Sequence, residues 1–180
     1  ILRESERMAK TITEFLHYAR PTTPEPQWFN LRKLADETVE QLTSENTVTC
    51  PIRVEIADTL DIYADRQQLQ LALLHLLSNS CYAAKNSLEP VVIQAAEVTA
   101  NGHEAEQVVI NIRDQGEGVD PGIADKIFEP FFTTREDTAG LGLTIVRQIV
   151  ASHNGTIALI PGWERGCTVR VQLPLPLAIP

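Results

Sequence analysis

The central part of the chain reads Val108-Val-Ile-Asn-Ile-Arg-Asp114-Gln-Gly-Glu-Gly118. The run from Val108 to Ile112 predicts a strand, and Asp114 stands where that strand ends. Gly116 and Gly118 then allow tight backbone turns and the close approach of a ligand. A carboxylate in this place can accept a hydrogen bond from an exocyclic amine, so the stretch predicts a binding loop. An ordinary glycine-rich turn with a solvated Asp114 fits the same residues.

A second pair of glycines, Gly140 and Gly142, opens a predicted helix that runs from Leu141 to His153. Glycines at a helix N-terminus expose backbone N–H groups where the helix dipole favours anions, so a triphosphate would suit this place. A plain glycine N-cap is the alternative. No Gly-Lys-Ser/Thr follows, which excludes a Walker A loop, and a third glycine and a preceding strand are missing for a dinucleotide fingerprint.

A long helix is predicted from Asp65, its N-cap, to about Ala84. It is apolar on nearly all sides, which indicates a buried helix that lies on a sheet. Asn79 within it costs helix propensity and buries a polar amide that needs a partner. That partner is either a hydrated Mg²⁺, which prefers oxygen ligands such as an amide carbonyl, or the backbone of a loop.

The aromatic stretch Phe128-Glu-Pro-Phe-Phe132 leads into a polar, irregular segment, which is predicted over residues 129–139 and overlaps its end. Two aromatic residues spaced by a proline can anchor one end of a mobile loop. Simple core packing by Phe128 and Phe131 is expected as well. Arg135, farther along this segment, would be able to reach a terminal phosphate.

The remaining elements complete a fold prediction. A helix is expected after Asn30, which would be its N-cap, and a short helix over 121–128. Strands are predicted over 52–56, 91–95, 156–160 and 167–173, with an Asn-Gly hairpin turn at 101–102. Hairpins dominate these pairings. The order therefore predicts an α/β two-layer sandwich, in which helices cover one face of a mixed, mostly antiparallel sheet.

Three segments are expected along the chain. Residues 1–20 predict a coiled-coil-like helix, because Met8, Ile12, Phe15 and Ala19 form an a/d-like seam. Residues 21–29 are a proline-rich linker, and residues 30–180 are the main domain. A lone helix of this length is marginal in water, so its seam needs the rest of the chain or another copy as a partner.

Composition limits the classes of function. The 180-residue chain has a net charge of −9, which disfavours a nucleic-acid surface but not a nucleotide site. Its three cysteines, Cys50, Cys81 and Cys167, are widely spaced and form no CxxC pair, so reduced thiols are expected, with neither zinc nor a disulfide. No apolar run near 18 residues and no signal peptide occur. We expect a cytoplasmic domain without membrane contact of its own, while the parent protein can still carry an anchor.

Taken together and in this order, these motifs resemble the catalytic and ATP-binding domain of sensor histidine kinases, within the wider GHKL (Bergerat-fold) family shared with gyrase, Hsp90 and MutL. The resemblance covers residues 30–175. Its motifs are the N box over 65–84, the first glycine box over 114–118, the F box over 128–131, the second glycine box over 140–143 and a last glycine element over 166–168.

The resemblance implies ATP and Mg²⁺ as ligands. Asp114 would bind the adenine amino group with help from Thr168, Asn79 would hold Mg²⁺, and residues 129–139 would form a lid. The reaction would be phosphoryl transfer from ATP to a histidine. The ATP-binding residues implied are Asn79, Tyr82, Asp114, Gly116, Gly118, Ile127, Phe128, Arg135, Gly140, Leu141, Gly142, Leu143 and Thr168.

Residues 1–20 resemble the end of the second helix of the kinase dimerisation hairpin. This implies a homodimer through a four-helix bundle in the intact protein and a response regulator as its partner. The phosphoacceptor histidine of such kinases lies on the first hairpin helix. None of His17, His75, His103 and His153 has that context, so this chain alone is not expected to phosphorylate itself.

Three positions depart from the family pattern. His75 stands where kinases have a second Asn, and it is a possible magnesium ligand; hydrolases of the wider family have a Glu there. Tyr82 stands at an often basic position, and Ala139 where Gly-Thr is usual. One alternative is therefore a degenerate kinase domain that serves as a dimer scaffold or nucleotide-binding module. Another is an ATPase of the gyrase or MutL type, which the missing Glu and the F box disfavour.

Overall fold

The computed structural model describes residues 12, 15–16, 23–44, 48, 50–99, 107–135, 138–162 and 165–176. The elements in these parts of the chain follow in the order β1 (Gln27–Asn30), α2 (Leu31–Ser44), β2 (Ile52–Ile56), β3 (Asp61–Ala64), α3 (Arg66–Ala83), β4 (Val91–Val98), β5 (Gln107–Asp114), α4 (Gly142–Ser152), β6 (Thr156–Pro161) and β7 (Cys167–Pro174). The predicted turn at 101–102 and most of the predicted helix over 1–20 lie outside the described residues.

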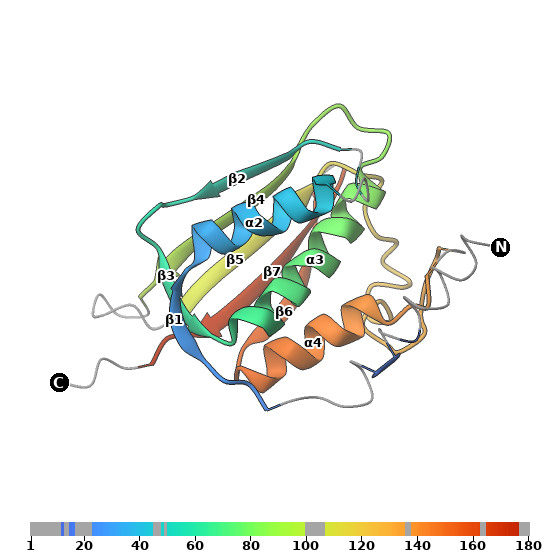
Figure 1. The fold of residues 1–180 in the computed structure, drawn as a ribbon. Coiled ribbons are helices and arrows are strands. Elements are labelled where there is room, and N and C mark those ends of the chain that lie inside the picture. The colour runs from blue at the N-terminus through green and yellow to red at the C-terminus, as the bar shows by residue number, and fades with distance from the viewer. Residues whose placement is uncertain are drawn as a thin grey trace.

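Five strands form the main sheet in the order β2-β4-β5-β7-β6. Strand β2 runs parallel to β4, and the other neighbouring pairs are antiparallel. Helices α2, α3 and α4 lie side by side on one face of this sheet (Figure 1). The predicted two-layer α/β sandwich with a mixed, mostly antiparallel sheet is confirmed.

Helix α3 is the central helix of that layer and packs against α2, α4 and β5. Its predicted N-cap is confirmed, because the Asp65 carboxylate accepts hydrogen bonds from the backbone N–H groups of Gln67 and Gln68. Side chains such as Leu73 and Leu77 are completely buried beneath it. Truncating one of them to Ala would cost about 2–5 kcal/mol, so the position of this helix is firmly set.

The start of α3 is tied to the end of α4 through His153. The backbone N–H of Asp65 donates to Nε2 of His153 at 2.9 Å, and Nδ1 of His153 lies 2.8 Å from the carbonyl oxygen of Ile149. A neutral imidazole with its proton on Nδ1 satisfies both contacts. Burial alone would raise the pKa of Asp65, but backbone N–H donors such as those of Glu25 and Gln68 outweigh it and lower that pKa.

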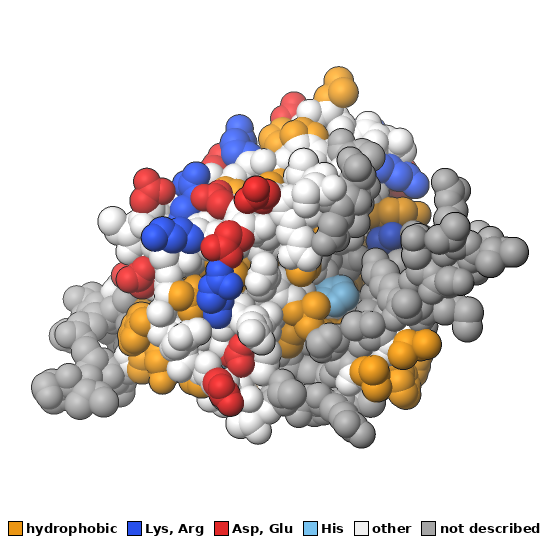
Figure 2. Space-filling view, in the orientation of Figure 1, with side chains coloured by type: hydrophobic (Ala, Val, Ile, Leu, Met, Phe, Trp, Pro, Cys, Tyr) orange, Lys and Arg blue, Asp and Glu red, His pale blue; other side chains and the backbone are white. Residues whose placement is uncertain are grey.

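The outer face of the helix layer is charged and solvated. Acidic and basic side chains intermingle over α2 on the face that Figure 2 shows. Arg32 pairs with Asp36 one turn along α2, and Arg66 at the start of α3 pairs with Glu37 of α2. Such exposed pairs each contribute only about 0–1 kcal/mol, so the helix layer depends mainly on its buried apolar face.

A second, two-stranded sheet was not predicted. Strand β1 pairs antiparallel with β3, and the ring of Trp28 on β1 lies 5.5 Å from that of Tyr63 on β3. Residues 27–29 of the predicted linker therefore belong to this sheet. Each strand has only four residues, which is too short for a periodic pattern to be recognised. Asn30 ends β1 and caps α2 as predicted, because its side-chain oxygen accepts from the N–H of Lys33.

The predicted short helix over 121–128 is wrong. These residues form consecutive turns, in which the N–H of Ile123 bonds to the carbonyl of Asp120 and the N–H of Lys126 bonds to the carbonyl of Ile123. These bonds join residues three positions apart, as in turns, and Gly122 near the start of the segment has a low helix propensity.

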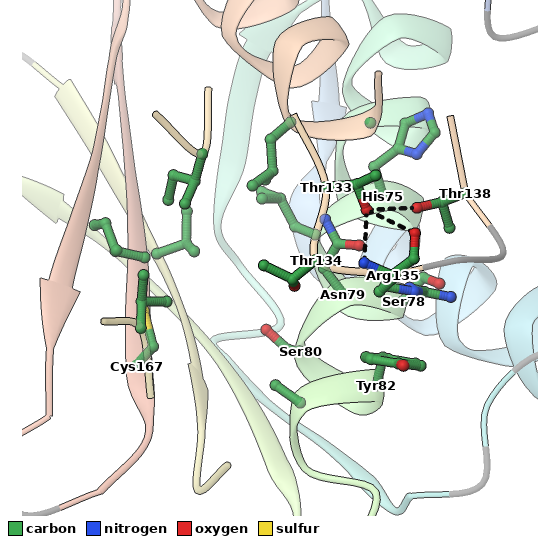
Figure 3. A pocket seen from close by; sticks show the side chains of 18 of the residues that line it. His75, Ser78, Asn79, Ser80, Tyr82, Thr133, Thr134, Arg135, Thr138 and Cys167 are labelled. Carbon is green, nitrogen blue, oxygen red and sulfur yellow. Dashed lines mark hydrogen bonds between the residues drawn. The ribbon is translucent and has the colours of Figure 1, made fainter. Parts of the chain in front are cut away.

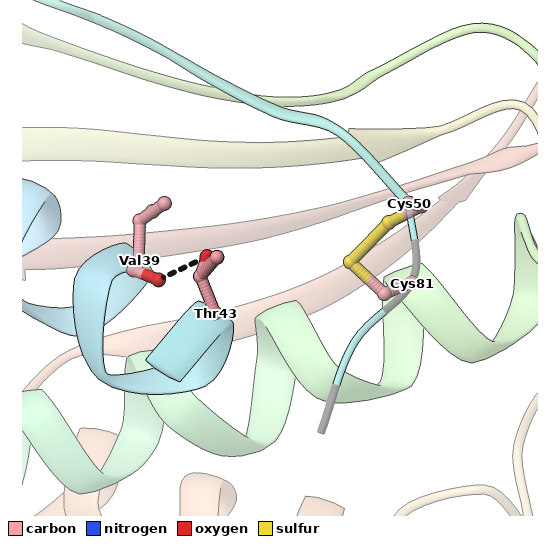
Figure 4. The surroundings of a disulfide bond; sticks show 4 residues. All are labelled: Val39, Thr43, Cys50 and Cys81. Carbon is pink, nitrogen blue, oxygen red and sulfur yellow. Dashed lines mark hydrogen bonds between the residues drawn. A yellow bond between two sulfur atoms is a disulfide. The ribbon is translucent and has the colours of Figure 1, made fainter. Parts of the chain in front are cut away.

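The expectation of three reduced thiols is also wrong. Cys50, just before β2, forms a disulfide with Cys81 near the end of α3 (Figure 4). Their Cα atoms are 5.6 Å apart, within the usual range for bridged cysteines. Cys167 is free and buried. The pair is separated by 31 residues, and only the packing of the segment before β2 against α3 reveals it.

Candidate nucleotide-binding site

One pocket of about 360 Å³ lies between α3, the segment after β5, residues 132–135 and 138–140, the start of α4 and the first residues of β7. Its size suits a small organic ligand. Nine of the predicted ATP-binding residues and the possible metal ligand His75 line it. The nine are Asn79, Tyr82, Asp114, Gly118, Ile127, Arg135, Gly140, Gly142 and Leu143.

Four predicted residues do not line this pocket: Gly116, Phe128, Leu141 and Thr168. Leu141 is buried in the core beside α4. Phe128 is half-buried, and its carbonyl oxygen accepts a hydrogen bond from the Thr144 hydroxyl at 3.3 Å. Gly116 lies behind the pocket and supports Asp114. These residues shape the site without facing it.

Asp114, at the end of β5, is the most buried charged residue of the pocket, with 5% of its surface exposed. Its Oδ1 accepts from the N–H of Gly116 at 3.0 Å, and its carboxylate also accepts from the Cys167 backbone and the Ser80 hydroxyl. Burial raises the pKa of Asp114, and these three donors only partly offset that effect. The carboxylate is thus held in one orientation, with its remaining acceptor capacity available to a ligand.

The glycines around Asp114 are required by close packing. A Cβ at Gly116 would lie 2.5 Å from the carbonyl oxygen of Ala83 on α3. Gly166 has a φ of +75°, and a Cβ there would lie 2.1 Å from the carbonyl oxygen of Asp114. Both glycines therefore let the loops close against the strand that carries the carboxylate.

The expected role of Thr168 beside Asp114 does not agree with the direction of its side chain. Cys167 is the register partner of Asp114 on β7, and Cys167 and Val169 line the pocket. Side chains alternate along a strand, so Thr168 between them faces the other side of the sheet. Burial, with a further contribution from the Asp114 charge, raises the pKa of the Cys167 thiol to about 12, so this thiol remains protonated.

The other end of the pocket is formed by α3 and α4. Asn79 and His75 both face it, as expected for residues one turn apart on a helix (Figure 3). Gly142 starts α4 so close to His75 that a Cβ there would lie 3.1 Å from Nδ1 of the ring. Leu141 at the N-cap offers no side-chain hydrogen bond to the first turn. Gly142, the first residue of α4, lines the pocket, so the start of this helix lies at this end.

The irregular segment closes the pocket wall. The Thr133 and Thr138 hydroxyls lie 3.0 Å apart and bridge the segment, and the N–H of Arg135 donates to the Thr133 hydroxyl (Figure 3). The two threonines and Thr134 line the pocket; they were predicted only as part of the lid segment, because nothing in their spacing distinguishes them from other polar loop residues. Residues 136–137 of the predicted lid lie outside the described part of the chain.

The aromatic stretch behaves differently from the core packing expected of it. Phe131 is 61% exposed and has a φ of +65°, so it is not a core residue. Phe132 lines the pocket instead. A Cβ at Gly140 would lie 2.6 Å from the carbonyl carbon of Phe131, which shows how closely the start and the end of the loop pack.

The chain belongs to the family described as histidine kinase-, DNA gyrase B-, and HSP90-like ATPases, which residues 64–177 match. It is 32% identical over 178 residues to sporulation kinase B of Bacillus subtilis (strain 168), covering 98% of this chain and 40% of that protein. It is 33% identical over 182 residues to the signal transduction histidine-protein kinase AtoS of Escherichia coli (strain K12), covering 97% and 28%. The chain thus spans less than half the length of these relatives.

Solved structures agree with this assignment. The catalytic domain of histidine kinase ThkA superposes with a TM-score of 0.72 at 25% identity, covering 84% of this chain and 96% of that one. Full-length ShkA in complex with AMPPNP superposes with a TM-score of 0.81 at 25% identity, covering 99% and 38%. The resemblance found in the sequence is therefore confirmed at the level of fold and family.

The residues of the pocket fit a magnesium nucleotide. Within the described residues there is no group of three or more His, Cys, Asp or Glu side chains that could hold a metal by themselves. Mg²⁺ commonly keeps several waters and takes its remaining ligands from one or two side chains and substrate phosphates, which a single Asn79 amide can satisfy.

Among the described residues, no helix is long and apolar enough to cross a membrane.

Proposed function

We propose that the pocket binds ATP with Mg²⁺ and supplies the γ-phosphoryl group for the phosphorylation of a histidine within a longer sensor kinase. The observation that carries this proposal is the buried Asp114 carboxylate, held by three donors at the inner end of a pocket whose other end is a helix start. The family of the chain and the names of its relatives support the same reading.

At the base end, Asp114 would accept a hydrogen bond from the exocyclic amine of adenine. Guanine presents a carbonyl oxygen at that position, which a carboxylate repels. A buried acceptor left without its donor loses affinity, so the pocket would discriminate between the two bases. Cys167, whose backbone N–H supports the carboxylate, would lie against the base as a small, uncharged side chain.

At the phosphate end, the N–H groups at Gly140 and Gly142 and the Arg135 guanidinium would bind phosphate oxygens. Asn79 would contribute its amide oxygen to the hydrated Mg²⁺, with His75 as its neighbour on the same helix face. When bound, Mg²⁺ would neutralise charge on the phosphate oxygens. The residues of the chain would thus orient the triphosphate so that its terminal phosphoryl group faces an incoming histidine.

Transfer to a histidine fits the site better than hydrolysis. Position 75 carries His rather than the Glu of hydrolases, and the described lining of the pocket includes no Glu. A positioned water would therefore lack its general base. In the intact protein we propose a cytoplasmic location for this domain, a homodimer through a helical hairpin to which residues 1–20 belong, and a response regulator as recipient of the phosphoryl group.

Two measurements test the proposal. Calorimetry of the 180-residue chain with ATP and Mg²⁺ should give saturable binding, and Asp114→Asn should abolish most of it. Radiolabelled ATP should label a separately supplied phosphoacceptor hairpin of the parent protein and leave this chain unlabelled. Absence of heat up to millimolar ATP would instead favour the scaffold alternative, and steady phosphate release that Asp114→Asn abolishes would favour an ATPase.

A further inference from the structure

Positive charge is scarce around this pocket. Arg135 is the only Lys or Arg among the described residues that line it, whereas Asp114 and Asp120 add carboxylates to the lining. A triphosphate would therefore depend strongly on one guanidinium. Arg135 lies in an irregular segment, where a long side chain loses considerable rotamer freedom when it is fixed in one place. A contact that already restricts the rotamers of Arg135 would reduce this entropic cost of binding a phosphate.

Tyr82 meets this requirement. It projects from α3 three residues after Asn79, lines the same pocket and keeps 40% of its surface exposed. The Cζ atom of Arg135 lies 3.8 Å from the centroid of the Tyr82 ring, well inside the range of a cation–π contact. Figure 3 shows the two side chains together on the same side of the pocket.

The backbone at this point is also held. The N–H of Arg135 donates to the Thr133 hydroxyl at 3.0 Å, and Thr133 is in turn 3.0 Å from Thr138. The residue is therefore restrained both at its backbone, by loop hydrogen bonds to Thr133, and at its guanidinium, by an aromatic ring. Because the Tyr82 ring projects from the buried helix α3, it fixes the position of the guanidinium relative to the rigid part of the domain.

We propose that Tyr82 is a positioning residue, whose ring holds the Arg135 guanidinium at the mouth of the pocket for a nucleotide's phosphate chain. This inference rests on the proposed function. Tyr82 stands at a position that is often basic, yet its ring does not simply remove a positive charge from the site. Instead, the face of the ring binds nearby cationic side chains. The ammonium group of Lys85 also approaches it, at 4.7 Å from the centroid.

The contact requires the face of the ring and makes no use of the hydroxyl group. Tyr82→Phe keeps the ring and Tyr82→Leu removes it, so these two substitutions form a matched pair. A partly exposed cation–π contact corresponds to about a two- to fivefold effect on affinity. The effect should appear only with ligands that carry the outer phosphates, because Arg135 is assigned to them.

The experiment is calorimetry of the whole chain with ATP and with AMP. Tyr82→Phe should bind both ligands as wild type does. Tyr82→Leu should bind ATP about two- to fivefold more weakly and AMP unchanged, and adding it to Arg135→Gln should cause no further loss. Lys85→Gln is the control on the same ring, and it should change ATP affinity less than Tyr82→Leu because Lys85 does not line the pocket.

Three results would overturn the inference while leaving ATP binding intact. They are an equal loss in Tyr82→Phe and Tyr82→Leu, parallel losses for ATP and AMP, and additive losses in the double variant. Additivity would mean that Tyr82 and Arg135 act independently. If the wild-type chain bound no ATP at all, the proposed function would fail together with this inference.

Discussion

The base end of the pocket is built from two strands and a buried helix, whereas the phosphate end is built from a loop and a helix start. Asp114 is 5% exposed and is held by donors on β7, on α3 and in its own loop. Arg135, by contrast, is restrained by a threonine hydroxyl and by a tyrosine ring that is 40% exposed. In the proposed function, the base would thus be recognised by a rigid end of the pocket, and the phosphates would be bound by a more adjustable end.

This difference predicts that substitutions at the base end should reduce nucleotide affinity strongly and that substitutions at the phosphate end should reduce it only moderately. A change at the base end removes a buried, charged hydrogen-bond acceptor that nothing else replaces. A change at the phosphate end removes one of several partly exposed contacts.

Asp114→Asn should have the largest effect. Hydrogen bonds to charged groups contribute about 1.5–3 kcal/mol, so ATP affinity should fall about ten- to hundredfold. The free energy of unfolding at pH 7 should not fall with it, because burial disfavours the charged form of Asp114 in the folded state. Calorimetry and urea denaturation measure the two quantities. Loss of both binding and folding would contradict a base end in which the carboxylate serves recognition.

Gly140→Ala should have the next largest effect, and Gly142→Ala is its matched partner. Gly140 has a φ of +71° and a Cβ there would lie 2.6 Å from the Phe131 backbone, so strain of about 1–3 kcal/mol is expected. At Gly142 the nearest neighbour of the new methyl group would be the His75 ring, at 3.1 Å, rather than backbone. Urea denaturation should therefore rank Gly140→Ala below Gly142→Ala in stability, and the reverse order would contradict the loop geometry.

The pH dependence of stability follows from the raised pKa of Asp114. Between the ordinary value of 3.8 and the raised value, the folded state binds more protons than the unfolded state. The contribution of Asp114 to stability therefore falls as pH rises through this window. Relative to Asp114→Asn, the wild type should therefore gain stability as the pH is lowered through this window, which urea denaturation of both proteins at several pH values measures. A difference that is constant with pH would mean that the carboxylate is not desolvated.

His75→Asn should have the smallest effect. It would restore an amide one turn before Asn79, and one further oxygen ligand should increase the stimulation of ATP binding by Mg²⁺ about two- to fivefold. Titration of ATP with and without Mg²⁺, in both variants, measures this. No change would mean that Asn79 alone is sufficient and that the phosphate end tolerates His75.

The sequence predicted those structural elements whose formation is determined by residues close together in the chain. The Asp65 cap, the buried α3 and the strand that ends at Asp114 each follow from a cap, a hydrophobic pattern or a glycine. Together with the order of the glycine motifs, they were sufficient for the fold and for most of the pocket. Nine of thirteen predicted binding residues line it; Asn79 and Tyr82 lie on α3, and Asp114 ends β5.

The missing parts depend on contacts between distant segments. That Cys167 rather than Thr168 faces the pocket depends on the register of β7 against β5, which no local pattern contains. The Cys50–Cys81 disulfide depends on how the segment before β2 packs against α3. Strands β1 and β3 are separated by α2 and β2 in the sequence and form a sheet of their own, and the exposed Phe131 follows from a left-handed backbone within the loop.

The central claim is that the buried Asp114 recognises the exocyclic amine of adenine. The most direct test is the affinity of the wild-type chain for ATP against purine riboside triphosphate, which lacks only that amine. With Mg²⁺ present and the phosphates identical, the phosphate end contributes equally to both. We predict that loss of the amine weakens binding by about tenfold or more, since a buried charged acceptor is left unpaired. Equal affinities for the two triphosphates would contradict the account.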